Sequence, residues 1–168
     1  MKRLYLYFTL LVFLSSCISQ KKLSKTNRVN SVIGKARTYI GTPYKWGGND
    51  KKGIDCSGLL VRSFESVGMK LPRTTSQQVD MGRNIKLKRI INWLRGQPIS
   101  LAKSKEGDLV FFAFGKSKRE VTHVGIVSNV EDNSNIKFIH ASSSKGVVET
   151  QLIRDYYLKR IRKIKRVF

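Results

Sequence analysis

The sequence predicts an α+β fold, with helices first along the chain and a small antiparallel sheet after them. Between residues 29 and 94, apolar side chains recur at helical spacing. From Gly107 onward, short runs rich in β-branched and aromatic residues alternate with polar turns, which is typical of strands. Because helices and strands occupy separate stretches, the pattern favours an α+β domain over alternating parallel units.

Size and composition agree with one globular domain. The chain has 168 residues, of which 40% are hydrophobic and 26% charged, so a disordered polymer and a fibrous repeat are both excluded. The charge is unusual, since 33 Lys and Arg residues face 11 Asp and Glu residues, giving a net charge of +22. Such a chain attracts anionic polymers and acidic membrane surfaces.

The first seventeen residues predict export. Lys2 and Arg3 precede an apolar run over residues 4–14, and small residues then lead to Cys17. The run is too short to span a bilayer. Residues 14–17 resemble the lipobox of bacterial lipoproteins, so we expect a signal peptide over residues 1–16 and a lipid on Cys17. The alternative is an ordinary secretory signal with a cysteine near its end.

Export narrows the choice of partners. Residues 17–28 are polar and basic, and they predict a tether between the lipid anchor and a domain over residues 29–168. Ile18 stands where an Asp would signal inner-membrane retention, which favours a lipid-anchored protein of the outer membrane facing the periplasm. No aromatic-basic nucleic-acid motif is present, so the basic stretches predict contacts with anionic envelope surfaces rather than with nucleic acid.

Three helices are expected in the first part of the domain, and a further segment is a candidate for a fourth. The first covers residues 29–40, and the second begins at an N-cap, Asp55, with Cys56 in its first turn. A Thr-x-x-Gln capping box within residues 74–78 opens a short third helix, which Gly82 closes. A fourth helix is possible over residues 87–94.

Three strands are expected after Gly107. They cover residues 109–114, 121–127 and 136–141. The polar residues 131–135 suit a hairpin turn between the last two. Neighbouring strands should therefore be antiparallel.

Three residues are candidates for chemistry. Cys56 lies at a predicted helix N-terminus, where the helix dipole and free N–H groups lower a thiol pKa and favour a nucleophile. His123 and His140 project from predicted adjacent strands, so they can act as a base for Cys56 and as a group that orients that base. The alternatives are a buried core cysteine, a disulfide to Cys17, core histidines, and a metal site, although the spacings match no structural zinc signature.

Six blocks of sequence, in order, carry a resemblance to a known family. The blocks are Gly41–Gly48, Asp55–Leu59, Leu71–Gln78, Gly107–Phe112, Thr122–Ile126 and Phe138–Ser142. Through them the chain resembles the NlpC/P60 family of papain-like cell-wall endopeptidases, and the similarity extends over residues 29–168.

The resemblance implies a papain-like fold and a thiol mechanism. Cys56 would attack a carbonyl of a peptidoglycan stem peptide, His123 would be the base, and His140 would hold the His123 ring in its productive tautomer. Tyr44 would help to stabilise the oxyanion. The acyl-enzyme would be hydrolysed by water, without a metal or organic cofactor.

The resemblance also assigns flanking roles. Asp55 would cap the helix or contact substrate amines, Ser57 would line a subsite, and Arg73 would give structural support. Residues 84–105 form a longer link than is usual in the family; they would shape the substrate cleft or form a peripheral helix.

The resemblance thus favours a peptidoglycan hydrolase of the cysteine endopeptidase type. Two alternatives from other classes stay open: a non-catalytic peptidoglycan-binding lipoprotein, and a thiol-dependent amidase or acyltransferase.

Overall fold

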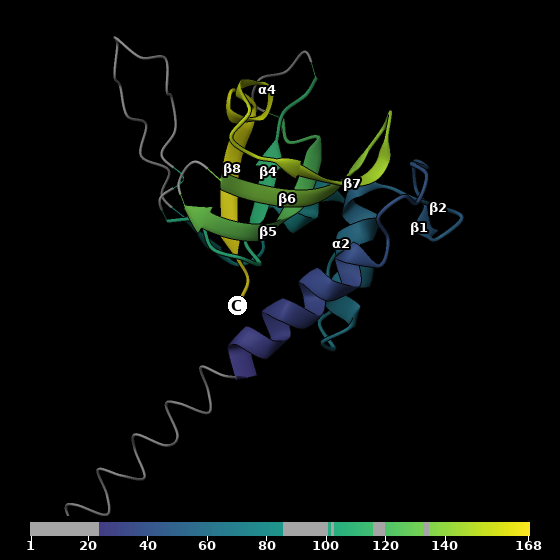
Figure 1. Cartoon of the computed structure of the whole chain (residues 1–168). Coiled ribbons are helices and arrows are strands. Elements are labelled where there is room, and N and C mark those ends of the chain that lie inside the picture. Colours follow the sequence, from purple (N-terminus) through teal and green to yellow (C-terminus); the bar gives the residue numbers. More distant parts are fainter. Residues whose placement is uncertain (1–23, 86–100, 102, 116–119, 133–134) are drawn as a thin grey trace, which may run out of the picture.

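A computed structural model describes residues 24–85, 101, 103–115, 120–132 and 135–168. It confirms the α+β class. The N-terminal helices lie against one side of a strongly curved antiparallel sheet, and the C-terminus lies near the start of the first helix (Figure 1).

The sheet contains six strands within the described residues, and all its pairs are antiparallel. Their order is β3-β8-β4-β5-β6-β7. The strands are β3 (Arg83–Asn84), β4 (Leu109–Phe112), β5 (His123–Asp132), β6 (Asn135–Ser142), β7 (Gly146–Gln151) and β8 (Ile161–Arg166). A separate hairpin pairs β1 (Asn49–Asp50) with β2 (Gly53–Ile54). The three predicted strands and the β5–β6 hairpin are confirmed, whereas β3, β7, β8 and the β1–β2 hairpin were not predicted.

The sheet is buried on both sides. Alternate residues of β5 and β6 face opposite sides, as strand geometry requires. On the helix side, Val124 and Ile139 pack in one core with Leu59 and Phe64 of α2 (Cys56–Glu65). On the other side lies a second core, formed by residues that include Val110, Phe112, Val127, Phe138, Ile161 and Ile164.

The first helix differs from the prediction at its start. It covers residues 24–37 of the described chain, so residues 24–28 are helical and not part of an irregular tether. The guanidinium of Arg28 lies 5.1 Å from the centroid of the Phe168 ring, and Val29 packs on Gly107, where a Cβ atom would come within 2.9 Å of it. These contacts hold the first turns on the domain. No helix among the described residues is long and apolar enough to cross a bilayer.

The next two helices begin where the sequence predicts. Asp55 is the N-cap of α2, and its carboxylate accepts a hydrogen bond from the Gly58 N–H. The short helix α3 (Thr75–Gln78) follows its N-cap, Thr74. The Thr74 side chain makes no capping hydrogen bond to the backbone, and its hydroxyl instead donates to the Gln77 side chain at 2.9 Å, so the predicted capping box is wrong. The possible helix over residues 87–94, the signal peptide over residues 1–16 and Cys17 lie outside the described residues.

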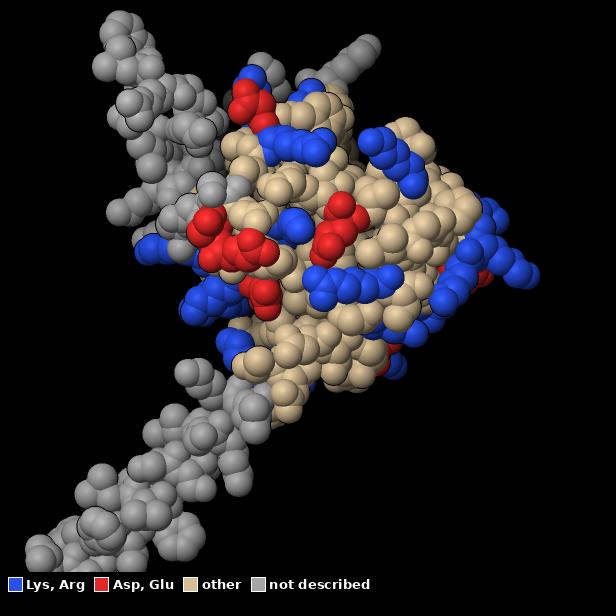
Figure 2. All heavy atoms as spheres, in the orientation of Figure 1, with Lys and Arg blue, Asp and Glu red and all other residues tan. Residues whose placement is uncertain are grey.

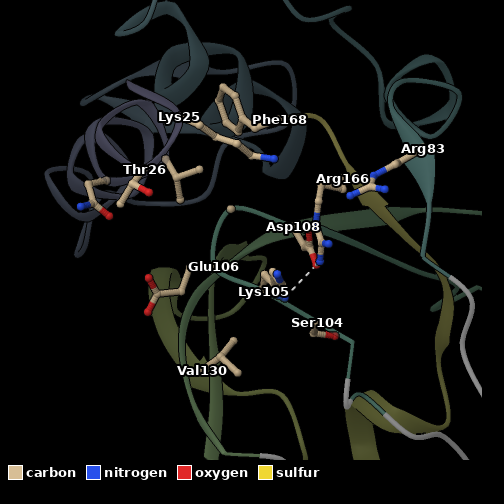
Figure 3. Close-up of a pocket in the computed structure, with 13 residues that line it drawn as sticks. Lys25, Thr26, Arg83, Ser104, Lys105, Glu106, Asp108, Val130, Arg166 and Phe168 are labelled. Atoms are coloured by element: carbon tan, nitrogen blue, oxygen red, sulfur yellow. Dashed lines mark hydrogen bonds and ion pairs between the residues drawn. The ribbon is translucent and has the colours of Figure 1, made fainter. Parts of the chain in front are cut away.

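The unpredicted strand β8 lies between β3 and β4 and is fixed by a buried ion pair. Arg166 donates two hydrogen bonds of 2.7 Å to the carboxylate of Asp108, whose side chain is 1% exposed. Figure 3 shows this pair on the wall of a cavity of about 520 Å³, which also has Lys25, Arg83 and Glu106 on its lining. None of the predicted site residues lines this cavity.

Candidate active site

The Cys56 thiol lies between the start of α2 and the start of β5. It is a free cysteine, and its side chain is buried in the helix-side core. The Thr75 hydroxyl lies 3.7 Å from Sγ, and the backbone N–H of Val124 hydrogen-bonds to the sulfur. Because Val124 follows His123 in the chain, the thiol lies at the end of β5 that carries this histidine.

The thiol pKa is raised overall, although Cys56 lies at a helix N-terminus. Burial raises the pKa of Cys56 above its usual value, and the negative charge of Asp55 raises it further. The hydrogen bonds from Thr75, Val124 and Ser57 lower the pKa but do not offset burial. The expectation of an activated thiolate in the resting protein is therefore wrong: desolvation outweighs the helix terminus.

His123 and His140 form a hydrogen-bonded pair. His123 Nε2 lies 2.8 Å from His140 Nδ1, and the two rings meet edge to face. Gly125 leaves the space for this pair, since a Cβ atom there would lie 2.6 Å from the Phe138 ring and 3.1 Å from the His140 Cβ. The ring of Phe138 stacks on His140 with 4.6 Å between centroids and fixes its plane.

The second nitrogen of His140 continues the chain of polar contacts. His140 Nε2 lies 3.4 Å from the hydroxyl of Tyr157, which the sequence did not suggest. If neutral His123 is to accept a proton at Nδ1, its own proton must be on Nε2. That N–H then donates a hydrogen bond to His140 Nδ1. His140 then carries its proton on Nε2, directed at the Tyr157 oxygen.

Both imidazoles are neutral at pH 7. Burial lowers the pKa of His123 to about 3, and the neighbouring His140 contributes to this shift. Burial lowers the pKa of His140 to about 4. A neutral imidazole can act as a base at the moment a neutral thiol attacks, rather than as half of a preformed ion pair.

A compact ionic cluster supports the N-terminus of α2. Arg73 donates to both carboxylate oxygens of Asp55, at 2.9 and 2.8 Å, and also to the Ser57 hydroxyl and the Gly48 carbonyl. Asp55 also accepts from the N–H groups of Gly47 and Gly58. Arg73 holds the pKa of Asp55 below its usual value, against the effect of burial. The side chains of Asp55, Ser57 and Arg73 are thus engaged with one another and with the backbone.

Two further residues lie close to the cysteine. Burial raises the pKa of Tyr44, and the neighbouring Cys56 and Asp55 raise it further, so its phenol keeps its proton and can donate a hydrogen bond at neutral pH. The Gln78 side chain donates to the carbonyls of Ser57 and Pro72, which ties α3 to the first turn of α2.

The structure brings the predicted residues into two groups that meet at Val124. Tyr44, Asp55, Ser57 and Arg73 surround Cys56, while His123 begins β5 and His140 lies near the end of β6. Sequence reasoning missed the contact roles of Thr75, Gln78 and Tyr157. The first two lie in the Leu71–Gln78 block, which marks them as neighbours of the site, but no sequence signal points to Tyr157. No cluster of three His, Cys, Asp or Glu residues suited to a metal occurs in the described part.

Comparisons with family models, with curated proteins and with solved structures all find the same family. The model described as "NlpC/P60 family" matches residues 41–166. The "Murein DD-endopeptidase MepS/Murein LD-carboxypeptidase" of Escherichia coli K12 is 38% identical over 130 residues, covering 77% of this chain and 57% of the relative. The chain therefore matches little more than half the length of this relative.

Two further matches are a second curated relative, of which a larger share is covered, and a solved structure with a similar fold. The "Probable endopeptidase NlpC" of Escherichia coli K12 is 34% identical over 132 residues, covering 78% of this chain and 73% of that protein. A Staphylococcus aureus structure, described as similar to a lipoprotein of the NLP/P60 family, superimposes with a TM-score of 0.62 at 29% identity, covering 84% of this chain and 42% of the other.

Proposed function

The chain belongs to the NlpC/P60 family, and from this membership we propose that it is a peptidoglycan hydrolase, a cysteine endopeptidase that cleaves stem peptides or their cross-links. The observation that carries the proposal is the Cys56 thiol at the start of α2, in contact with the backbone N–H that directly follows the paired His123. A thiol, an imidazole base and a group that orients the base are the parts of a thiol hydrolase. The relatives' names, which include murein endopeptidases, support this substrate class.

In the proposed mechanism His123 acts as base and then as acid. As Cys56 Sγ attacks the peptide carbonyl, its proton passes to His123 Nδ1, while His123 Nε2 donates to His140. The C–N bond breaks and His123 returns the proton to the leaving amine, which leaves a thioester on Cys56. Water then attacks the thioester, His123 accepts the proton of the water, and the thiol is restored.

The groups around the cysteine have supporting roles in this proposal. The phenol of Tyr44, which keeps its proton, donates to the oxyanion. Asp55 is assigned to capping α2 rather than to binding a substrate amine, because both its oxygens are occupied. Ser57 and Arg73 position Asp55 and the turn before the nucleophile.

We also propose that the protein is held in the cell envelope by a lipid on Cys17, with residues 1–16 removed and the catalytic domain connected through the segment after Cys17. The Staphylococcus aureus neighbour, which is described as "similar to lipoprotein", supports an anchored form. Figure 2 shows Lys and Arg side chains spread over the visible face rather than gathered in one patch, with acidic side chains near the end of β5. Such a distribution suits diffuse attraction to anionic envelope polymers and lipids.

The test is digestion of purified peptidoglycan by the protein, with mass spectrometry of the released fragments. We expect peptide-cleaved fragments whose masses identify the bond, and none above background with Cys56→Ala. Sedimentation with the sacculi in the absence of any fragments, across several wall chemistries and pH values, would instead support the non-catalytic binding protein. Release of fragments by Cys56→Ala at the wild-type rate would exclude the thiol mechanism.

A further inference from the structure

A basic and aromatic surface lies beside the histidine end of the candidate site. It consists of Phe114, Tyr156 and Arg160, and we call it the α4 surface because Tyr156 belongs to α4 (Asp155–Leu158). The Tyr156 side chain is 55% exposed, and the Phe114 ring meets the His123 ring edge to face with 5.4 Å between centroids. The surface therefore continues directly from the imidazole.

Strand register sets the distance from Arg160 to the histidine. Phe112 of β4 pairs with Ile161 on one side and with His123 on the other, and the Ala113 N–H donates to the Arg160 carbonyl at 3.0 Å. Arg160 and His123 are thus two strands apart, roughly 10 Å between backbones.

The guanidinium of Arg160 is held in place. Its Cζ lies 4.2 Å from the centroid of the Tyr156 ring and 5.6 Å from that of Phe114, and Nη1 donates to the Tyr156 carbonyl at 2.7 Å. A guanidinium stacked on rings loses less freedom when it binds a ligand than a mobile one does.

The charge of Arg160 has no carboxylate partner within the described residues. The nearby Asp155 carboxylate pairs with Lys159 at 3.5 Å. Only one nitrogen of the Arg160 fork has a hydrogen bond there, so the guanidinium retains donors for a planar anion. A carboxylate fits this geometry.

The reaction direction identifies which part of a substrate meets Arg160. In the mechanism above, His123 gives its proton to the leaving amine, so the leaving segment lies on the His123 side of Cys56. An extended residue spans about 3.3–3.6 Å, so Arg160 is within reach of a group about two residues beyond the scissile bond. Resting on the proposed function, we propose that Arg160 binds a free carboxylate of the leaving segment and that the enzyme prefers short acidic leaving groups.

The test uses one pair of probes. Both are the tetrapeptide L-Ala-γ-D-Glu-diaminopimelyl-D-Ala. In one probe the carboxyls of the diaminopimelyl and D-Ala residues are free, and in the other they are amidated. We compare the wild type with Arg160→Gln and Arg160→Lys, and the matched control is Lys159→Gln, which removes an equal charge one residue away on an exposed side chain. Both kcat/KM for the peptides and binding of each peptide to the same variants in a Cys56→Ala background are measured.

The wild type should favour the free carboxylates by about 10- to 100-fold in kcat/KM, the range of one charge-assisted contact. Arg160→Gln should abolish this preference, mainly through KM, while hydrolysis of the amidated peptide stays within about threefold, which also shows that the variant folds. Arg160→Lys should keep part of the preference because a lysine does not form a bidentate contact, and Lys159→Gln should keep all of it.

Two results would overturn the inference: a wild type that binds and cleaves both peptides equally, or an Arg160→Gln variant that loses both activities in equal measure. The binding comparison decides the point even if neither peptide is cleaved. Failure of the proposed function is seen separately, as absence of fragments from whole peptidoglycan.

Discussion

Replacing His123 with alanine is expected to lower kcat/KM for peptidoglycan peptides by at least about a thousandfold, because the burial-raised pKa of Cys56 leaves the thiol dependent on a base. His123 directly precedes Val124, whose backbone N–H contacts the thiol. Steady-state rates of fragment release from a defined muropeptide measure the loss.

The pH profile distinguishes a base from a merely structural histidine. Since the pKa of His123 is lowered to about 3, the base stays neutral through the mildly acidic range. The acid limb of wild-type kcat/KM should therefore lie well below pH 6.5, the value for an exposed histidine. The residual activity of His123→Ala should instead rise with pH as hydroxide supplies the thiolate. Retention of a tenth or more of wild-type activity at pH 7 by a folded His123→Ala protein would remove His123 from the mechanism.

Replacing Arg73 with methionine is expected to lower the free energy of unfolding by about 2–4 kcal/mol. The variant leaves the Asp55 carboxylate, whose side chain is 9% exposed, without the cation that holds its pKa down. The remaining hydrogen bonds from Gly47, Gly58 and Ser57 and the partial exposure of Arg73 limit the loss. Urea unfolding at pH 7 measures it.

The chain offers a matched control for this prediction. Arg62 pairs with Glu65 at 2.9 Å, and the Arg62 side chain is 37% exposed, close to the 38% of Arg73, but Glu65 is 44% exposed. Arg62→Met should therefore cost less than about 0.5 kcal/mol. Equal losses in the two variants would show that Asp55 does not depend on Arg73.

Local signals were enough to place Cys56 and the two histidines on their elements. Asp55 is a strong N-cap residue directly before an apolar helical stripe, so the start of α2 at Cys56 follows from the sequence. The alternating, β-branched runs around His123 and His140 likewise mark β5 and β6. Both features depend only on neighbours along the chain.

The parts that sequence reasoning missed depend on tertiary contacts. β8 contains Arg162, Lys163 and Lys165, and so many charged residues are not typical of a strand inside a sheet. Its place in the sheet depends on Ile161 and Ile164, which pack in the second core. The raised thiol pKa of Cys56 results from burial, which a helix-terminus argument leaves out. Tyr157 reaches His140 from α4, seventeen residues away, and no spacing rule connects the two.

The proposed thiol mechanism requires a transient acyl group on Cys56, which mass spectrometry can detect. The protein is mixed with a muropeptide, quenched in acid within the first turnovers, and analysed by intact mass and peptide mapping. We expect an added mass equal to the acyl half of the cleaved peptide on the fragment that contains Cys56, lost on treatment with hydroxylamine and absent from Cys56→Ala. Cleavage of the muropeptide by a protein whose Cys56 has been fully alkylated would exclude the thiol mechanism.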